Sequence, residues 1–193
     1  MNKLISSSIA TLAFAASSHA AIIEFNFLGK AGAGLLSGNE NVTINGTPGS
    51  GGELAGGPFG GIFYDDASNL LTFNVGWGSG QGFLDLTGTV TAGHLHGPAS
   101  FTQNAGVKYP LDSLPGWNPS RTNGGFTGST TILETDEAAL LGGLFYFNVH
   151  TAAGGGGVNP GGEIRGNHVV PEPSSIGLLA FGALAILRRR SRG

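Results

Sequence analysis

"GFLDLTGTVTAGHLHG", residues 82–97, alternates apolar and polar side chains as a half-buried β-strand does. Side chains two positions apart point to the same side of a strand. We therefore expect one apolar side, continued at the strand's end by two histidines; it carries Leu84, Leu86, Val90, Ala92, His94 and His96. Gly97 and Pro98 should end the strand, and the segment that follows, as far as Gly125, is expected to be irregular.

Further β-patterns lie on both sides of this stretch. Runs rich in β-branched and aromatic residues predict strands at 21–29, 126–133, 144–151 and 161–170, a hairpin at 60–77, and a short strand around 41–44. One short helix is expected at 135–143, with Thr135 as its cap and Gly142 at its end. Because strands do not alternate with helices along the chain, the pattern predicts an all-β, antiparallel β-sandwich with one short helix.

Composition narrows the class of protein. Glycine supplies 36 of 193 residues, which suits short strands joined by tight turns, and cysteine is absent, so no disulfide can stabilise the fold. Residues 21–170 hold four basic and eleven acidic side chains, a net charge of −7. This charge argues against nucleic acid and anionic lipid as partners, and it is compatible with binding cations.

The N-terminus has the three parts of a secretory signal peptide. Lys3 supplies the positive charge, residues 4–16 are mostly apolar or small, and Ser18 and Ala20 are the small residues that a signal peptidase needs. We expect cleavage after Ala20, which would remove residues 1–20 on export.

The C-terminus combines a short motif, an apolar run and a basic tail. Pro171, Glu172 and Pro173 precede 12 uninterrupted apolar residues at 176–187, and arginines follow at once. The order resembles the PEP-CTERM sorting signal of Gram-negative bacteria, which implies processing by a membrane protease, an exosortase. The run is shorter than the roughly 20 residues of a full membrane span, but flanking residues can extend it into a transient inner-membrane anchor. A simple tail anchor is the alternative.

Three motifs occur in order between the two ends: "GHLHGPA" (93–99), "GGLFYFNVHT" (142–151) and "NPGGEIRG" (159–166). Together they resemble the signature of the CHRD domain, and the resemblance covers nearly all of residues 21–170. It implies an immunoglobulin-like β-sandwich with a likeness to Cu/Zn superoxide dismutases. It implies no particular activity. The expected organisation is a signal peptide at 1–20, a CHRD domain at 21–170 and a sorting segment at 171–193.

His94, His96 and His150 are the candidate site residues. If their strands are neighbours, the three imidazoles could hold zinc or copper, with Glu163 or water as the fourth ligand. Alternatively, the histidines hydrogen-bond loop carbonyl groups and hold no metal. His168 is less suited because it lies near the end of the last strand, and Glu163 is expected to form an internal ion pair with Arg165.

Motifs of the common enzyme classes are missing from the sequence. It has no G-x-S-x-G nucleophile motif, no phosphate-binding loop with its lysine, and no cysteine nucleophile. We therefore expect a non-enzymatic protein of the cell envelope or extracellular matrix, without a cofactor. Its partners would be signal peptidase, the sorting protease and matrix components such as exopolysaccharide. The alternative is a zinc- or copper-dependent redox or hydrolytic enzyme that uses the histidine cluster.

Overall fold

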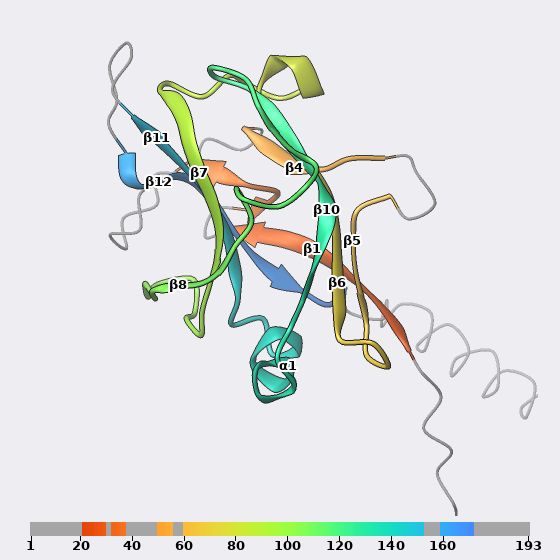
Figure 1. Cartoon of the computed structure of the whole chain (residues 1–193). Coiled ribbons are helices and arrows are strands. Elements are labelled where there is room, and N and C mark those ends of the chain that lie inside the picture. Colours follow the sequence, from red (N-terminus) through yellow and green to blue (C-terminus); the bar gives the residue numbers. More distant parts are fainter. Residues whose placement is uncertain (1–20, 30–31, 38–49, 56–59, 153–158, 172–193) are drawn as a thin grey trace, which may run out of the picture.

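A computed structural model describes residues 21–29, 32–37, 50–55, 60–152 and 159–171 (Figure 1). The predicted signal peptide, the short strand around Asn41–Ile44 and the sorting segment from Glu172 onward lie outside these residues. Within them, no helix is long and apolar enough to cross a membrane. The strands are β1 (Ile22–Gly29), β2 (Gly32–Ala33), β3 (Leu36–Ser37), β4 (Gly51–Glu53), β5 (Ile62–Asp65), β6 (Leu70–Trp77), β7 (Thr89–His96), β8 (Val107–Pro110), β9 (Trp117–Pro119), β10 (Gly124–Thr131), β11 (Tyr146–Ala152) and β12 (Asn159–Val169); the helices are η1 (Ser79–Gln81) and α1 (Glu134–Leu141).

The strands form one antiparallel sheet that curls over itself. Along the sheet the order is β8-β7-β11-β12-β1-β5-β6-β10-β9, with β2, β3 and β4 paired at its sides. Strand β1 joins the two halves, because residues 26–28 pair with β12 while residues 22–25 pair with β5. The chain is therefore all-β with one short α-helix, as the sequence pattern predicts.

The core lies between the two halves of the sheet and is rich in aromatic rings. Phe147 on β11 stacks on Phe27 at 5.7 Å and faces Phe73 on β6 at 6.2 Å between ring centroids. Trp77 on β6 packs against Trp117 on β9 at 5.1 Å. The contact between Phe147 on β11 and Phe73 on β6 joins strands of opposite halves of the sheet, so aromatic burial holds the curled halves together.

Strand β7 corrects the prediction for residues 82–97. Regular strand begins only at Thr89, and the register between β7 and β11 shifts where His150 faces Ala92 but Thr151 faces Val90. This bulge reverses the alternation, so Val90 packs against the core while Ala92 and the two histidines lie on the opposite face. Leu95, which was expected on the polar side, is fully buried in the core.

Two further local predictions need correction. The segment before Gly125 is not wholly irregular, because β8 pairs with β7 and β9 pairs with β10. Thr135 lies inside α1 and not at its cap; Leu133 precedes the helix without a side-chain cap, and Gly142 ends it as predicted.

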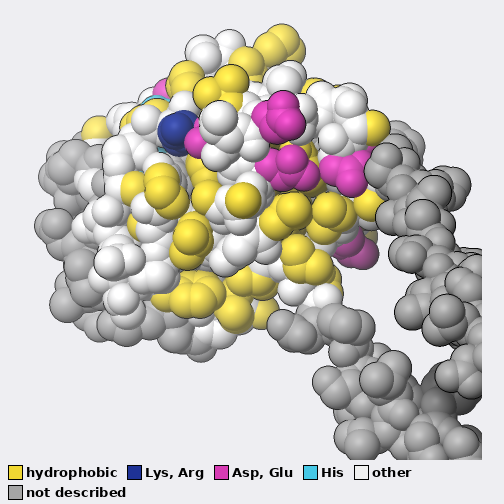
Figure 2. Space-filling view, turned by 90° about the horizontal axis from the view of Figure 1, so that it is seen from below, with side chains coloured by type: hydrophobic (Ala, Val, Ile, Leu, Met, Phe, Trp, Pro, Cys, Tyr) yellow, Lys and Arg dark blue, Asp and Glu magenta, His cyan; other side chains and the backbone are white. Residues whose placement is uncertain are grey.

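An acidic face surrounds α1. Figure 2 shows acidic side chains gathered on the face seen from below, where α1 and the β5–β6 turn lie. Burial, together with the nearby carboxylates of Glu137 and Asp66, raises the pKa of Tyr64 to about 12. Asp136 accepts hydrogen bonds from Tyr109 and Lys108; burial raises its pKa, but these two partners outweigh burial and lower it below the usual value.

Candidate metal centre

Three histidines meet on the outer face of the sheet, where β7 and β11 run side by side. In the antiparallel register, His94 faces Asn148, His96 faces Tyr146, and His150 faces Ala92. Residues that face each other across two strands point to the same side of the sheet. The two strands are therefore neighbours, which is the condition for a metal site of these three histidines, and the three imidazoles project from one surface.

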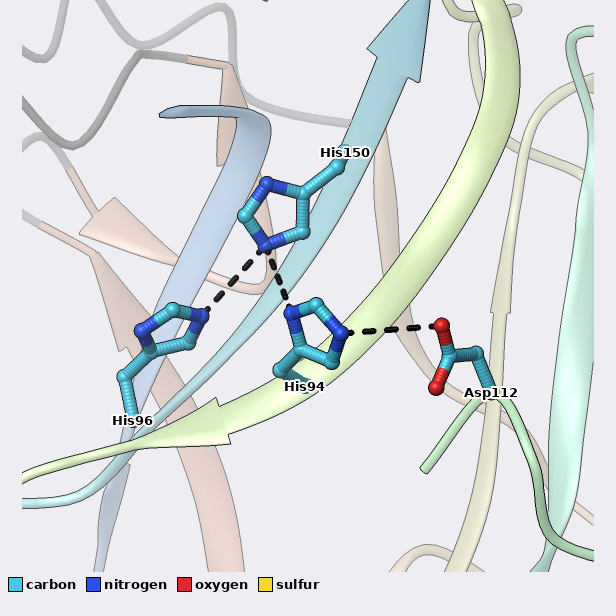
Figure 3. Close-up of polar contacts among 4 residues, drawn as sticks. All are labelled: His94, His96, Asp112 and His150. Atoms are coloured by element: carbon cyan, nitrogen blue, oxygen red, sulfur yellow. Dashed lines mark hydrogen bonds and ion pairs between the residues drawn. The ribbon is translucent and has the colours of Figure 1, made fainter. Parts of the chain in front are cut away.

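One nitrogen of each imidazole points to a common centre (Figure 3). Nδ1 of His94 lies 3.1 Å from Nε2 of His150, and Nε2 of His96 lies 3.4 Å from the same atom. Each residue can offer one ligand nitrogen such that all three lie within 4.8 Å of one another. Three ligands at about 2.0–2.1 Å from a tetrahedral metal would be about 3.3–3.4 Å apart. The two printed separations are close to that spacing, and the third pair of nitrogens, within 4.8 Å, would have to move closer to hold a metal.

The outward nitrogens of two histidines have polar partners. Nε2 of His94 lies 3.5 Å from a carboxylate oxygen of Asp112, and Nδ1 of His96 lies 3.0 Å from the carbonyl oxygen of Ala105. Both partners are acceptors, so they favour the tautomers that carry hydrogen on the outward nitrogens. The inward nitrogens, Nδ1 of His94 and Nε2 of His96, then carry the lone pairs that a metal requires.

The centre is largely buried but borders a cavity. His96 and His150 are 3% and 8% exposed, and the side chain of His94 is 19% exposed. A cavity of about 530 Å³ adjoins all three imidazoles. Its other walls are short or uncharged side chains: Thr91, Ala92, Ala105, Gly106, Val107, Thr151 and Ala152.

The imidazole of His96 is one of three stacked planar groups. It lies parallel to the ring of Tyr146, with centroids 5.0 Å apart, and the guanidinium of Arg165 lies 3.5 Å from the same ring. These groups come from β7, β11 and β12, and Tyr146 sits on the middle strand. The stack restricts rotation of His96, because a tilt would collide with its neighbours.

Arg165 and Tyr146 also hold the segment between β7 and β8 in place by hydrogen bonds. Arg165 donates hydrogen bonds to the carbonyl oxygen of Ser100 and to the side chain of Asn104. The hydroxyl of Tyr146 bonds Ala105, whose carbonyl oxygen also meets His96. The position of this segment is thus coupled to the position of one of the three imidazoles.

Glu163 does not join the histidines, so the prediction that it could be the fourth ligand is wrong. Its carboxylate accepts hydrogen bonds from the backbone of Thr87 and Gly88 and from the hydroxyl of Thr151. These contacts occupy its carboxylate, and among the described residues the group that can hold a metal contains only the three histidines. The expected ion pair with Arg165 is not formed: Glu163 bonds Thr87, Gly88 and Thr151, and Arg165 bonds Ser100 and Asn104.

His168 lies apart from the centre, inside the aromatic core. It is fully buried and packs edge-on against Phe25, Phe27 and Phe73. Burial lowers its pKa to about 4, although a hydrogen bond to the carbonyl oxygen of Phe145 opposes that shift. His168 is therefore a neutral core residue, which explains why it takes no part in the cluster.

Asp112 is the residue that sequence reasoning missed. It follows β8 after Leu111, and its backbone N–H and that of Leu111 both bond the carbonyl oxygen of Gly93. This pair of bonds places its carboxylate beside His94. Only the pairing of β8 with β7 reveals this proximity, and the sequence around Asp112 has no motif that marks it.

The family model for the CHRD domain matches residues 33–168 of the chain. The chain belongs to the CHRD domain family. The match spans every strand that carries the histidine centre, so the CHRD domain itself contains the site. Neither a curated protein nor a solved structure gave a significant match to the chain.

A second model, the PEP-CTERM protein-sorting motif, matches residues 169–192 and follows the CHRD domain directly. It overlaps the end of β12, and its proline-glutamate-proline begins at Pro171. The protein is therefore one that is exported and sorted at the cell envelope by exosortase-type machinery.

Proposed function

We propose that this exported protein binds one transition-metal ion, copper or zinc, through His94, His96 and His150. The observation that carries the proposal is the convergence of three imidazole nitrogens within 4.8 Å of one another. The proposed role is that of a non-enzymatic binding protein of the envelope or extracellular matrix.

The tautomers of His94 and His96 suit a metal at the centre. With hydrogens on the outward nitrogens of His94 and His96, both inward nitrogens are acceptors facing Nε2 of His150. If the hydrogen of His150 is on Nδ1, its Nε2 also carries a lone pair that faces the centre. A cation at the centre accepts all three lone pairs at once.

The donor set favours copper or zinc over calcium or magnesium. Imidazole nitrogen suits zinc, copper, iron and nickel, whereas magnesium and calcium need several oxygen ligands. The three inward donors are all nitrogen, and Asp112 approaches only the outward side of His94.

The binding role is supported by the surroundings of the site. The cavity walls within the described residues hold no carboxylate, amine or guanidinium that could act as an acid or base, so the histidines are the only titratable groups there. A bound metal would fix His96 and, through Ala105, the segment that covers the sheet. The sorting motif supports an envelope or matrix setting, in which exopolysaccharide is the proposed neighbour.

Signal-peptide cleavage after Ala20 is part of the same proposal. The backbone nitrogen of Ala21 lies 2.7 Å from a carboxylate oxygen of Asp66. Cleavage would turn this nitrogen into an ammonium group, which the carboxylate would stabilise as a charge-assisted hydrogen bond.

A metal-dependent redox or hydrolytic enzyme is the second candidate. The cavity beside the histidines favours it, because catalytic metal sites keep a position open while structural sites are closed by four protein ligands. Assays of superoxide dismutation and ester hydrolysis with the copper- and zinc-loaded protein would separate it from the binding role.

Thermal melting tests the proposal. Protein purified without a nickel column is melted with a chelator, and again with added copper or zinc, for wild type, His96→Ala and the control Tyr109→Phe, whose hydroxyl bonds Asp136 and not the histidines. We expect the chelator to lower the melting temperature of wild type and of the control, and added metal to restore it. The melting temperature of His96→Ala should change with neither. A hydrogen-bonded cluster would instead make His96→Ala about 1–3 kcal/mol less stable, with no metal response in any of the proteins.

A further inference from the structure

We infer that the fourth coordination position of the metal takes an anion from the cavity beside the histidines. The inference rests on the proposed metal site and names the ligand class that the site admits. The proposed fourth ligand is an anion that binds the metal through oxygen or nitrogen, such as a carboxylate or a small inorganic anion.

The first step is the position of the opening. The three imidazoles approach the centre from β7 and β11, which form one side of it. The cavity of about 530 Å³ is lined by the same three imidazoles. Ala105, Gly106 and Val107, where the chain enters β8, form another part of its wall. A metal held by the histidines would thus face a space that no ligand among the described residues fills, and that space admits an exogenous molecule.

The second step is charge. Neutral imidazoles leave the full +2 charge of a divalent metal uncompensated. The described lining of the cavity carries no charged side chain, and Asp112 meets only the outward nitrogen of His94. Two of the three histidines are almost completely buried, so water screens the centre weakly. An anion at the fourth position lowers this electrostatic cost, whereas a neutral donor does not.

The third step is shape. The cavity is lined by very small residues, namely Ala92, Ala105 and Gly106. The exposed Thr91, at the bulge in β7, also lines the cavity. The space accepts a ligand larger than water. Azide probes the inorganic source of the anion, while acetate and glucuronate probe organic carboxylates.

The experiment uses the full exported protein loaded with copper(II), whose electron paramagnetic resonance spectrum reports a change of ligand. Azide, acetate and glucuronate are titrated in turn, with acetamide as the uncharged counterpart of acetate. We expect at least azide or one carboxylate to change the spectrum saturably, and acetamide to leave it unchanged.

Charge variants make the test specific to this cavity. Thr91→Asp should weaken binding of the anion about three- to tenfold at low salt, and Thr91→Lys should strengthen it, with both effects shrinking at high salt. Thr131→Asp adds the same charge on β10, in the other half of the sheet, and should leave anion affinity unchanged.

The outcomes separate the inference from the proposed function. Copper bound by three nitrogens, with a spectrum that no anion alters, would overturn the anion site and leave the metal site intact. Equal anion affinity in the two Thr91 variants would also overturn it. A protein that binds neither copper nor zinc would overturn both.

Discussion

Nδ1 of His94 and Nε2 of His150 lie 3.1 Å apart, although the residues are 56 positions apart in the chain. Their strands are antiparallel neighbours, and the bulge that lets Thr151 face Val90 places Ala92 and both histidines of β7 on the outer face. The cluster is therefore built by strand pairing on the side of the sheet away from the aromatic core, where it borders the cavity.

Asp112 should tune the metal site without binding the metal. Replacing it by asparagine removes the charge that orients His94, and we expect metal affinity to fall about tenfold, at the low end of the range for such partners. Asp85→Asn is the matched control, because that carboxylate bonds Ser79 in a different part of the chain. Competition titrations with a chromophoric chelator measure both affinities; equal affinities in the two variants would contradict the role of Asp112.

The strands were predictable because each carries a strong local pattern. The hairpin at 60–77 and the strands around Phe25, Phe126, Phe147 and Ile164 follow from β-branched and aromatic runs between turn residues. The two short strands after β7 were not predictable, because β8 and β9 are three or four residues long and exist through pairing with longer neighbours.

The site was only partly predictable. Spacing alone places His94 and His96 on one side of a strand, but the neighbourhood of His150 followed from the resemblance to the CHRD signature. Which face they occupy depends on a one-residue bulge, which leaves no mark in the alternation. The sequence left Glu163 or water as the fourth ligand; in the fold the carboxylate of Glu163 accepts hydrogen bonds from the backbone of Thr87 and Gly88.

His168 should make the stability of the fold depend on pH. Its pKa is about 4 in the folded chain and about 6.5 when unfolded, so between these values the unfolded chain binds a proton that the folded chain does not. The free energy of unfolding should therefore decrease as pH falls from 6.5 to 4, by up to about 1.4 kcal/mol per pH unit. His168→Phe removes this contribution.

Urea denaturation of wild type and His168→Phe at pH 7 and pH 5 measures the effect. The variant should gain stability relative to wild type at the lower pH, whatever its stability at pH 7. Parallel losses in the two proteins would show that other groups cause the pH dependence.

The absence of a side chain at Gly93 leaves room for the indole ring of Trp117 against β7. A Cβ at this position would overlap the indole ring of Trp117, so Gly93→Ala must shift Trp117, which packs against Trp77. We expect a loss of about 1–3 kcal/mol, as for other overpacked sites. Gly106→Ala, where the added carbon meets no atom within 4 Å, should be nearly neutral in the same denaturation experiment.

Sorting should remove the arginine tail. The PEP-CTERM motif at 169–192 implies processing near Pro171, so mass spectrometry of protein exported by the host should find no peptide from residues 188–193. Glu172→Ala should retain the tail. A wild-type protein outside the cell that still carries its arginines would favour a plain anchor.

Anomalous diffraction from crystals soaked in copper or zinc, collected at the absorption edge of the metal, tests the metal site most directly. We predict one strong peak about 2.0–2.1 Å from Nδ1 of His94 and Nε2 of His96 and His150. The same soak of His150→Ala crystals should lose the peak. A peak elsewhere on the surface, or none in wild type, would contradict the metal site.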